Sequence, residues 1–437
     1  MKKIVIIFLL FSTPIFAQKV DKKLNKLIKE KEVSRIIKAL SADDMLGRDS
    51  KKPQEIAKAS AFIESEFEKI GLQKLNNLSS FKQDFNAIKI ERKATDIQIN
   101  GNKITDNEII VMSESESIIL NEKSSIQVLD KNMGFWENFQ KLNRDSTAKI
   151  ILVDSFHENS FRQAQHYYGK QRVLGRKNDK AGTKLYILGQ SNANAISVNI
   201  QQSVAKLPMN NVVGVLKGKS KKEEIVIFSA HYDHIGMMEP MAGDSIANGA
   251  DDDASGTTAV ISLAKYFKKM RSNERTLVFV AFTAEEIGGF GSKYFSESMN
   301  PDKIVAMINI EMIGKDSKWG KNSAFMTGIE KSSLGDILQK NLKGTQFAIN
   351  KDPYPEQDLF YRSDNATLAR LGVPAHSFST DQIDSDKLYH SVEDEFESLD
   401  MANIVATIKA LAIATQSIVS GVDTPTRIDK TGIRGSR

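Results

Sequence analysis

Residues 225–256 read IVIFSAHYDHIG, then a loop, then NGADDDASG, and this stretch decides the fold. The apolar, β-branched run at 225–228 has no helical period, which predicts a buried parallel strand. The strand ends in the polar residues 231–234, and the ends of such strands are where ligands bind in α/β sheets. After the loop, an acidic triplet at 251–253 directly precedes a segment with helical apolar spacing. The stretch therefore predicts a strand, a polar loop and a helix, with imidazole and carboxylate groups at the strand end.

The His and Asp side chains of this stretch allow two interpretations. Imidazole and carboxylate groups gathered at the end of a buried strand repel or desolvate one another, and an unpaired buried charge costs several kcal/mol. A divalent cation among them would remove this cost. The alternative is an acidic surface loop, and the triplet at 251–253 does not by itself decide between the two.

Length and composition describe a globular protein of more than one structural unit. The chain has 437 residues, 41% of them hydrophobic, and is too long for one simple core. Its formal charge of +5 is spread along the chain instead of forming a basic patch. Nucleic-acid binding therefore has no support.

Residues 1–17 have the features of a secretory signal peptide. Lys2 and Lys3 precede an apolar run at 4–11, and Ala17 stands before the expected cleavage site. The run is too short for a membrane span, which needs about 20 apolar residues. We therefore expect a secreted or periplasmic protein that leaves the membrane once the signal peptide is removed. The chain has no cysteine, which excludes a lipid-modified cysteine and disulfide bonds.

The pattern of hydrophobic residues divides the chain into segments of different character. Residues 20–42 and 57–70 have helical spacing, whereas 93–205 show short alternating runs broken by turns, which indicates a strand-rich insertion. From residue 211 strands and helices alternate, which predicts an α/β fold with a mixed, largely parallel sheet and helices on both faces. The expected parts are a signal peptide (1–17), an N-terminal helical part (18–90), an inserted β-rich domain (91–205), an α/β domain (206–423) and a disordered tail (424–437).

Three further polar clusters follow apolar runs of the α/β part: Glu285-Glu286, Glu311 and Tyr389-His390. Zinc takes imidazole nitrogen and carboxylate oxygen as ligands at about 2.0 to 2.2 Å. Two such ions about 3.5 to 4 Å apart need a bridging carboxylate and roughly one His plus one carboxylate each. The chain offers two His, three carboxylates and one further Glu that is left over as a base.

With these clusters the sequence resembles the M28 family of zinc-dependent exopeptidases, which includes bacterial aminopeptidases. The family motifs run H-x-D, G-A-D-D-x-A-S-G, E-E, N-x-D-M-x-G and Y-H, in this order. They stand here as His231-Tyr232-Asp233, GADDDASG at 249–256, Glu285-Glu286, NIEMIG at 309–314 and Tyr389-His390. The resemblance covers residues 206–420 well and 20–90 more loosely, and 91–205 sit where many relatives carry a protease-associated insertion.

The resemblance implies a set of ligands for two zinc ions. Asp252, three residues before the Ser of the second motif, would bridge the two ions. His231 and Glu311 would hold one ion, and Glu286 and His390 would hold the other.

The resemblance also implies roles for residues that do not bind metal. Glu285 would be the general base, and Asp233 would accept a hydrogen bond that sets the tautomer of His231. His234 has no counterpart among the family's ligands, so we interpret it as a residue of the loop or the substrate pocket rather than a ligand.

The sequence departs from the family at two places. The family usually has Asp where this chain has Glu311, whose carboxylate is one methylene further from the backbone. The stretch 362–365, Arg-Ser-Asp-Asn, is similar to the family's S-D-H element but has Asn in place of His.

These observations lead to an expected function. The residues indicate an exported dinuclear zinc hydrolase, and the resemblance supplies peptides as substrates and aminopeptidase as the activity. Two metals would polarise the scissile carbonyl and share a water of lowered pKa, while Glu285 would take its proton and return it to the leaving amine. The alternatives are a metallocarboxypeptidase, a glutaminyl-cyclase-like acyltransferase and a non-catalytic binding protein on the same fold.

Overall fold

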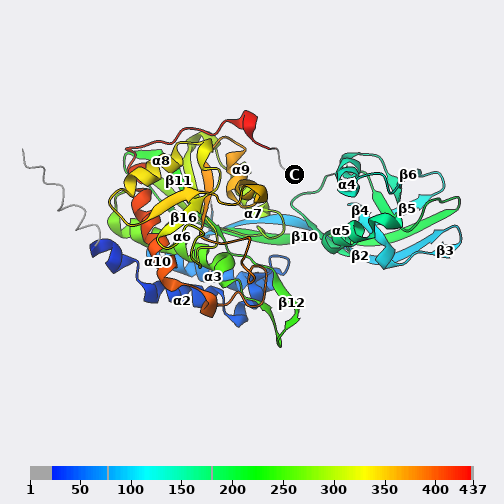
Figure 1. The fold of residues 1–437 in the computed structure, drawn as a ribbon, viewed down its shortest axis with the longest axis horizontal. Coiled ribbons are helices and arrows are strands. Elements are labelled where there is room, and N and C mark those ends of the chain that lie inside the picture. Colours follow the sequence, from blue (N-terminus) through cyan, green and yellow to red (C-terminus); the bar gives the residue numbers. More distant parts are fainter. Residues whose placement is uncertain (1–21, 76–77, 179–180, 435–437) are drawn as a thin grey trace, which may run out of the picture. The chain divides into compact units, whose positions relative to one another are not determined.

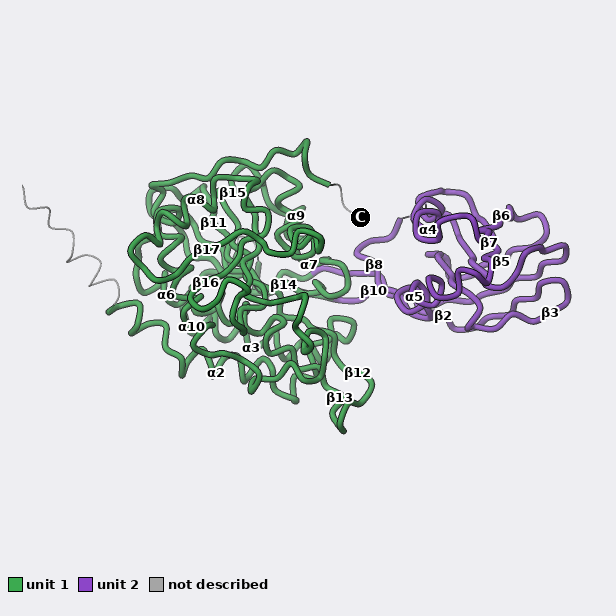
Figure 2. Tube along the Cα trace, in the orientation of Figure 1, with its two compact units in different colours: residues 1–84, 209–437 green, residues 85–208 purple. Residues whose placement is uncertain are grey.

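The computed structural model of the chain describes residues 22–75, 78–178 and 181–434. These fall into two compact units (Figure 2). Unit 1 comprises residues 1–84 and 209–437, and unit 2 comprises residues 85–208. The inserted unit thus begins and ends a few residues outside the predicted range of 91–205. The predicted signal peptide, residues 1–17, lies outside the described residues.

Unit 1 is built on a central sheet whose strands follow the order β17-β16-β18-β15-β11-β14-β10. Its strands are β10 (Ile196–Leu216, from residue 209 on), β11 (Lys221–His231), β14 (Arg275–Phe282), β15 (Ile304–Ile310), β16 (Ser323–Met326), β17 (Ala348–Lys351) and β18 (Ala375–Ser379). Strands β10, β11 and β16 are labelled in Figure 1. β11 pairs in parallel with β14 and β15, and β15 with β18. β10 and β16 join antiparallel, to β14 and β18 respectively. The predicted mixed, largely parallel sheet is confirmed.

Residues on the central strands alternate between two apolar layers. Val226 and Phe228 of β11 belong to the first layer, whereas Ile227 belongs to the second; on β14, Phe279 and Val278 divide in the same way. Because both faces of the sheet are covered, these strands read as continuous apolar runs in the sequence. Full burial of each such side chain contributes about 1.5 to 3 kcal/mol.

Helices supply the other half of each layer. The first layer contains residues of α2 (Glu30–Leu40), α3 (Pro53–Ile70), α6 (Gly256–Met270), α8 (Leu334–Asn341), α10 (Met401–Ala414) and α11 (Gln416–Val419). The second contains residues of α7 (Phe290–Ser298) and α9 (Asn365–Ala369). Helix α3 ends at Gly71, which adopts φ = 77°, a conformation that glycine accepts without steric cost.

The parallel strands end at one edge of the sheet. The register pairs His231 of β11 with Phe282 of β14, and Ser229 of β11 with Asn309 of β15. The segments that follow these three strands therefore lie next to one another at this edge. The loop before α6 carries a hairpin of β12 (Gly236–Met241) and β13 (Asp244–Ala247), and the short β1 (Gln73–Lys74) pairs with β10.

Unit 2 contains a four-stranded sheet of order β4-β9-β7-β6 and two helices. Its elements are β2 (Lys82–Ile99, from residue 85 on), β3 (Asn102–Lys103), β4 (Ile109–Met112), β5 (Ser117–Asn121), β6 (Ser125–Leu129), α4 (Phe135–Arg144), β7 (Lys149–Val153), α5 (Glu158–Tyr168), β8 (Gln171–Leu174), β9 (Lys184–Leu188) and the first part of β10. Both helices pack on one apolar cluster of this sheet. The inserted unit is thus rich in strands and also has two helices, α4 and α5.

The end of the chain corrects one expectation. Residues 424–434, predicted as part of a disordered tail, lie against unit 1. Ile428 is buried in the second apolar layer, and Nη1 of Arg427 donates to the carbonyl of Ile304 at 2.8 Å. The polar composition of the segment concealed these contacts because two isoleucines, Ile428 and Ile433, give no periodic signal.

Candidate metal centre

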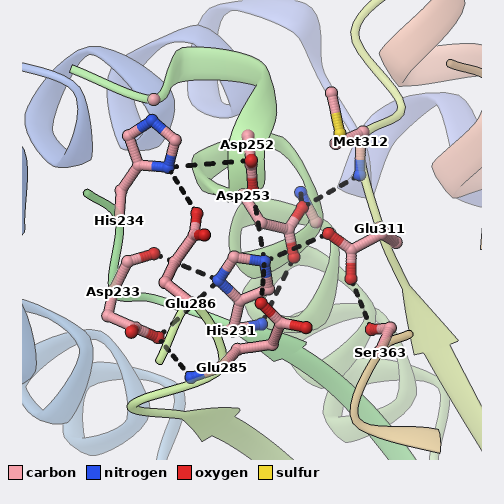
Figure 3. A network of polar contacts seen from close by, with 12 residues as sticks. His231, Asp233, His234, Asp252, Asp253, Glu285, Glu286, Glu311, Met312 and Ser363 are labelled. Carbon is pink, nitrogen blue, oxygen red and sulfur yellow. Dashed lines mark hydrogen bonds and ion pairs between the residues drawn. The ribbon is translucent and has the colours of Figure 1, made fainter. Parts of the chain in front are cut away.

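Segments from five places in the chain bring ionisable side chains together at the edge of the sheet. Figure 3 shows those of His231, Asp252, Glu285, Glu286 and Glu311. His231 ends β11, Asp252 precedes α6, Glu285 and Glu286 follow β14, Glu311 follows β15, and His390 lies in the loop after β18. Adjacent parallel strands converge at this edge, so residues far apart in sequence become neighbours. All six predicted metal ligands and base residues thus lie in one place.

The first group consists of His231, Asp252 and Glu311. Nε2 of His231 lies 3.0 Å from Oε1 of Glu311 and 3.2 Å from Oδ1 of Asp252. Nδ1 of His231 lies 3.0 Å from the backbone carbonyl of Asp233. A carbonyl can only accept, so Nδ1 carries the proton and Nε2 presents its lone pair to the two carboxylates.

Asp233 contacts His231 differently from what the sequence led us to expect. Its backbone carbonyl accepts the hydrogen bond, while its carboxylate Oδ1 lies 3.7 Å from Nδ1 of the ring. Oδ1 instead accepts the backbone N–H of Glu285 at 3.1 Å. Asp233 thereby connects the end of β11 to the loop after β14.

The second group surrounds the other oxygen of Asp252. Oδ2 of Asp252 lies 3.4 Å from Nε2 of His390, and the same nitrogen lies 3.1 Å from Oε2 of Glu286. His234 faces this group from the interior, with Nδ1 2.8 Å from Oε1 of Glu286. The two oxygens of Asp252 therefore face two different sets of histidine and carboxylate.

These distances fit a pair of zinc ions. Ligand atoms that each lie about 2.0 to 2.2 Å from one tetrahedral ion are separated from each other by roughly 3.3 to 3.6 Å, close to the 3.0 to 3.4 Å found within both groups. Imidazole nitrogen and carboxylate oxygen are both ligands that zinc takes in proteins. The residues present thus fit two cations that share Asp252.

The environments of two carboxylates differ. Burial raises the pKa of Asp252, but the surrounding histidines His234, His231 and His390 hold this pKa well below its ordinary value. Glu285 has the opposite shift, because burial together with the carboxylates of Glu311 and Glu286 raises its pKa well above the ordinary value. Glu285 therefore has the greater affinity for protons.

Glu311 reaches the first group in spite of its extra methylene. Its Oε1 faces His231, and its Oε2 accepts a hydrogen bond from Oγ of Ser363 at 2.6 Å. Asn309 in turn donates to Ser363 through Nδ2 at 2.8 Å. The longer side chain is thus held at both oxygens, and the contribution of Ser363 was not foreseen from the sequence.

Asn365, the other departure from the family pattern, lies away from this centre. It is fully buried, and its Nδ2 donates to the carbonyls of Phe360 and Ala375 at 3.0 and 3.3 Å. Its Oδ1 accepts from Oγ of Ser377. The substitution of Asn for His therefore serves the packing of α9 against the sheet.

Arg48 holds the loops of the centre from behind, which the sequence did not suggest. Its side chain is 1% exposed, and it forms no ion pair among the described residues. Its guanidinium donates to the backbone carbonyls of Leu40, Tyr232, Asn248, Gly249 and Asp252. Five donors in a rigid fork suit Arg for such a role, and they connect the N-terminal segment to both ligand-bearing loops.

A pocket opens beside the two groups. Asp252, Glu285, Glu286 and Glu311 form part of its lining. The remainder includes Met312, Phe325, Leu359, Ile383 and Tyr389, together with the charged Arg362 and Asp381. An apolar recess next to a polar centre is the usual form of a small-ligand site.

Comparisons with known proteins agree with this geometry. The model of peptidase family M28 matches residues 211–415. Aminopeptidase YwaD of Bacillus subtilis (strain 168) is 23% identical over 229 residues, which are 50% of this chain and 47% of that protein. The match thus spans about half the length of that relative.

Two solved structures share the fold. The aminopeptidase from Aneurinibacillus sp. strain AM-1 superposes with a TM-score of 0.58 at 19% identity, over 95% of this chain and 98% of that chain. BSAP, a zinc aminopeptidase from Bacillus subtilis, superposes with a TM-score of 0.57 at 18% identity, over 93% of this chain and 99% of that chain. The chain shares the fold of these two structures, and the resemblance to peptidase family M28 is confirmed over residues 211–415.

Proposed function

We propose that this chain is an exported aminopeptidase that uses two zinc ions, held by His231, Asp252 and Glu311 and by Asp252, Glu286 and His390. The observation that supports it most is the position of Asp252. Its Oδ1 lies 3.2 Å from His231 and its Oδ2 lies 3.4 Å from His390. A single carboxylate between two such groups is what a pair of ions needs.

The side chains divide the work of peptide hydrolysis among them. Zinc ions bound here would supply a Lewis acid for the scissile carbonyl and lower the pKa of a water molecule. Glu285, which lines the pocket, takes the proton of the attacking water and returns it to the leaving amine. Asp233 holds the backbone of Glu285, and Ser363 holds Glu311 in place.

Export is part of the proposal on the basis of residues 1–17. Across the described residues, none of the helices is both long enough and apolar enough to span a bilayer. The sequence features of the first 17 residues are those of a signal peptide. We propose a secreted or periplasmic protein.

The alternatives make different demands on the site. A single-zinc acyltransferase does not require both groups around Asp252, and a non-catalytic relative does not require Glu285 beside the pocket. His231 and His390 lie on either side of Asp252, and Glu285 lines the pocket, which supports the two-ion proposal. A metallocarboxypeptidase would use the same centre, so the end of the peptide that is cleaved must be tested directly.

The test compares peptides with free and blocked ends. An aminopeptidase should release the first residue of a free peptide and leave its N-acetylated counterpart intact, because the blocked substrate has no α-amino group to bind. Products are identified by mass spectrometry, with a C-terminally amidated peptide as the matched control, which should be cleaved like the free one. Equal cleavage of the acetylated peptide, or release of the last residue, would overturn the aminopeptidase proposal.

Glu311 provides a test of the ligand assignment. In the Glu311→Ala variant we expect about one zinc ion per chain instead of two, because His231 and Asp252 alone are a weak site. Glu311→Asp should also weaken the binding of this ion, since the shorter side chain cannot reach both His231 and Ser363. Elemental analysis measures the metal content, and Glu239→Ala on the exposed strand β12 serves as control. Two ions and normal turnover in Glu311→Ala would show that another carboxylate binds the metal.

A further inference from the structure

His234 is the residue of the H-x-D-H stretch to which the proposed function gives no role. It is 1% exposed and does not line the pocket beside the centre. Its Nδ1 lies 2.8 Å from Oε1 of Glu286 and 3.7 Å from Oδ2 of Asp252 (Figure 3). Of the two interpretations of His234, as a residue of the loop or of the substrate pocket, the structure supports the loop, in which His234 is buried behind the second group.

The ring of His234 is held in one orientation. Its backbone N–H donates to the carbonyl of Arg48 at 3.2 Å. Gly249 packs against the ring at φ = 57°, and a Cβ at this position would lie 2.6 Å from Cγ and Cδ2 of the ring. Only a glycine leaves enough space here. The chain thus fixes the direction in which Nδ1 points.

Two roles are possible for a histidine at this place, a metal ligand or a hydrogen-bond donor. A histidine that binds metal donates its other ring N–H to an acceptor, as His231 does to the carbonyl of Asp233. Nε2 of His234 is buried and has no hydrogen-bond partner within the described part of the chain. With the proton on Nδ1, the ring donates at 2.8 Å to Glu286 and Nε2 needs no acceptor. The geometry therefore favours the donor.

The two oxygens of Glu286 have separate partners. Oε1 lies beside His234, whereas Oε2 lies 3.1 Å from Nε2 of His390. A carboxylate with one oxygen occupied by an N–H presents the other in a defined direction. Without that donor, rotation about the last bond of Glu286 would no longer be restricted by a hydrogen bond.

We propose that His234 is a positioning residue whose Nδ1–H holds Oε1 of Glu286 and directs Oε2 toward the zinc ion shared with His390 and Asp252. The inference rests on the proposed function, because it assumes that Glu286 and His390 hold an ion. It adds a residue that acts on the metal through Glu286 and does not itself bind the metal.

The experiment measures the affinity of each zinc ion by competition with a chelator in His234→Ala and His234→Asn. The amide nitrogen of Asn occupies a position like that of Nδ1, so it can still donate to Glu286. In His234→Ala one ion should bind about 10- to 100-fold more weakly, the usual effect of losing such a partner, and the other should be unchanged. His234→Asn should remain within a few-fold of the wild type, whereas His234→Gln, whose amide extends one bond further, should resemble His234→Ala.

A buried histidine elsewhere in unit 1 provides the matched control. His376 is 0% exposed, and its ring forms hydrogen bonds with the carbonyl of Thr327 and the hydroxyl of Ser332. His376→Asn should keep the affinities for both zinc ions even if its melting temperature falls. This control distinguishes the loss of a buried ring from the loss of the contact with Glu286.

The outcomes distinguish the inference from the proposed function. Unchanged affinities in His234→Ala would overturn the positioning role while leaving the two-ion centre intact. Equal losses in the Asn and Ala variants, with a changed absorption spectrum of the cobalt-substituted protein, would make His234 a ligand and also overturn it. A wild-type protein that binds fewer than two ions would overturn both. If His234→Ala does not fold, the contrast between the Asn and Gln variants decides.

Discussion

Removal of both metal ions should abolish peptide hydrolysis, and readdition of zinc should restore it. The wild-type protein should contain close to two zinc equivalents, because Asp252 lies between two complete groups of ligands. Cations would also neutralise the carboxylates of Asp252, Glu286 and Glu311, whose charges are costly to bury. The measurement is turnover and elemental analysis before and after exhaustive chelation.

Metal removal should also lower the stability of unit 1. An ion that binds only the folded chain raises the free energy of unfolding by RT ln(1 + [L]/Kd), where [L] is the concentration of the free ion. This increase is about 2.7 kcal/mol when [L] is a hundred times Kd. The melting temperature should therefore fall on chelation and recover with zinc. Full turnover in a protein shown to contain no metal would overturn the proposal of a zinc hydrolase.

Glu285→Gln should keep both ions, and its turnover should fall by a factor of about 10² to 10⁴, the range that a general base contributes. Oε2 of Glu285 lies 4.0 Å from Nε2 of His231, further than the 3.0 Å of Glu311. Glu285 also lines the pocket, so its carboxylate can reach a water beside the peptide. Gln has the same shape and cannot accept the proton.

Glu286→Gln is the matched comparison for this variant. The two residues are adjacent in the chain, but Glu286 contacts His234 and His390 and is expected to bind metal. Its Gln variant should lose zinc together with activity. If instead Glu285→Gln loses the metal and Glu286→Gln keeps it, the two roles are exchanged.

Much of the fold could be predicted because apolar patterns report burial directly. The runs at β11, β14 and β15 are continuous because helices cover both faces of the sheet, and a parallel sheet places the ends of such runs at one edge. The full lengths of the strands β2 and β10 were not predicted, and neither was helix α7. Strands β2 and β10 are long and mostly polar on one side. Helix α7 follows the loop that carries Glu285 and Glu286, and its apolar residues show little helical period.

The candidate site shows the same division between local pattern and distant contact. His231, Asp252, Glu285, Glu286, Glu311 and His390 stand in short motifs that follow strands, and the structure brings all of them together. Arg48 belongs to no such motif, and Ser363 stands in the stretch similar to the S-D-H element, for which the sequence predicted no contact with Glu311. Their hydrogen bonds reach the centre across 184 and 52 residues of chain, and no local pattern reports a partner at that distance.

The sequence by itself determined which chemical groups meet at the edge of the sheet, because residue types and strand order are local properties of the chain. Only the tertiary structure decided which atom of each group faces which partner. His231 and His234 are three residues apart and both buried, yet one presents Nε2 to Asp252 and Glu311 and the other presents Nδ1 to Glu286. The physical reason is that loop backbone conformation sets the direction of each ring, and this conformation depends on distant contacts such as those of Arg48 and Gly249.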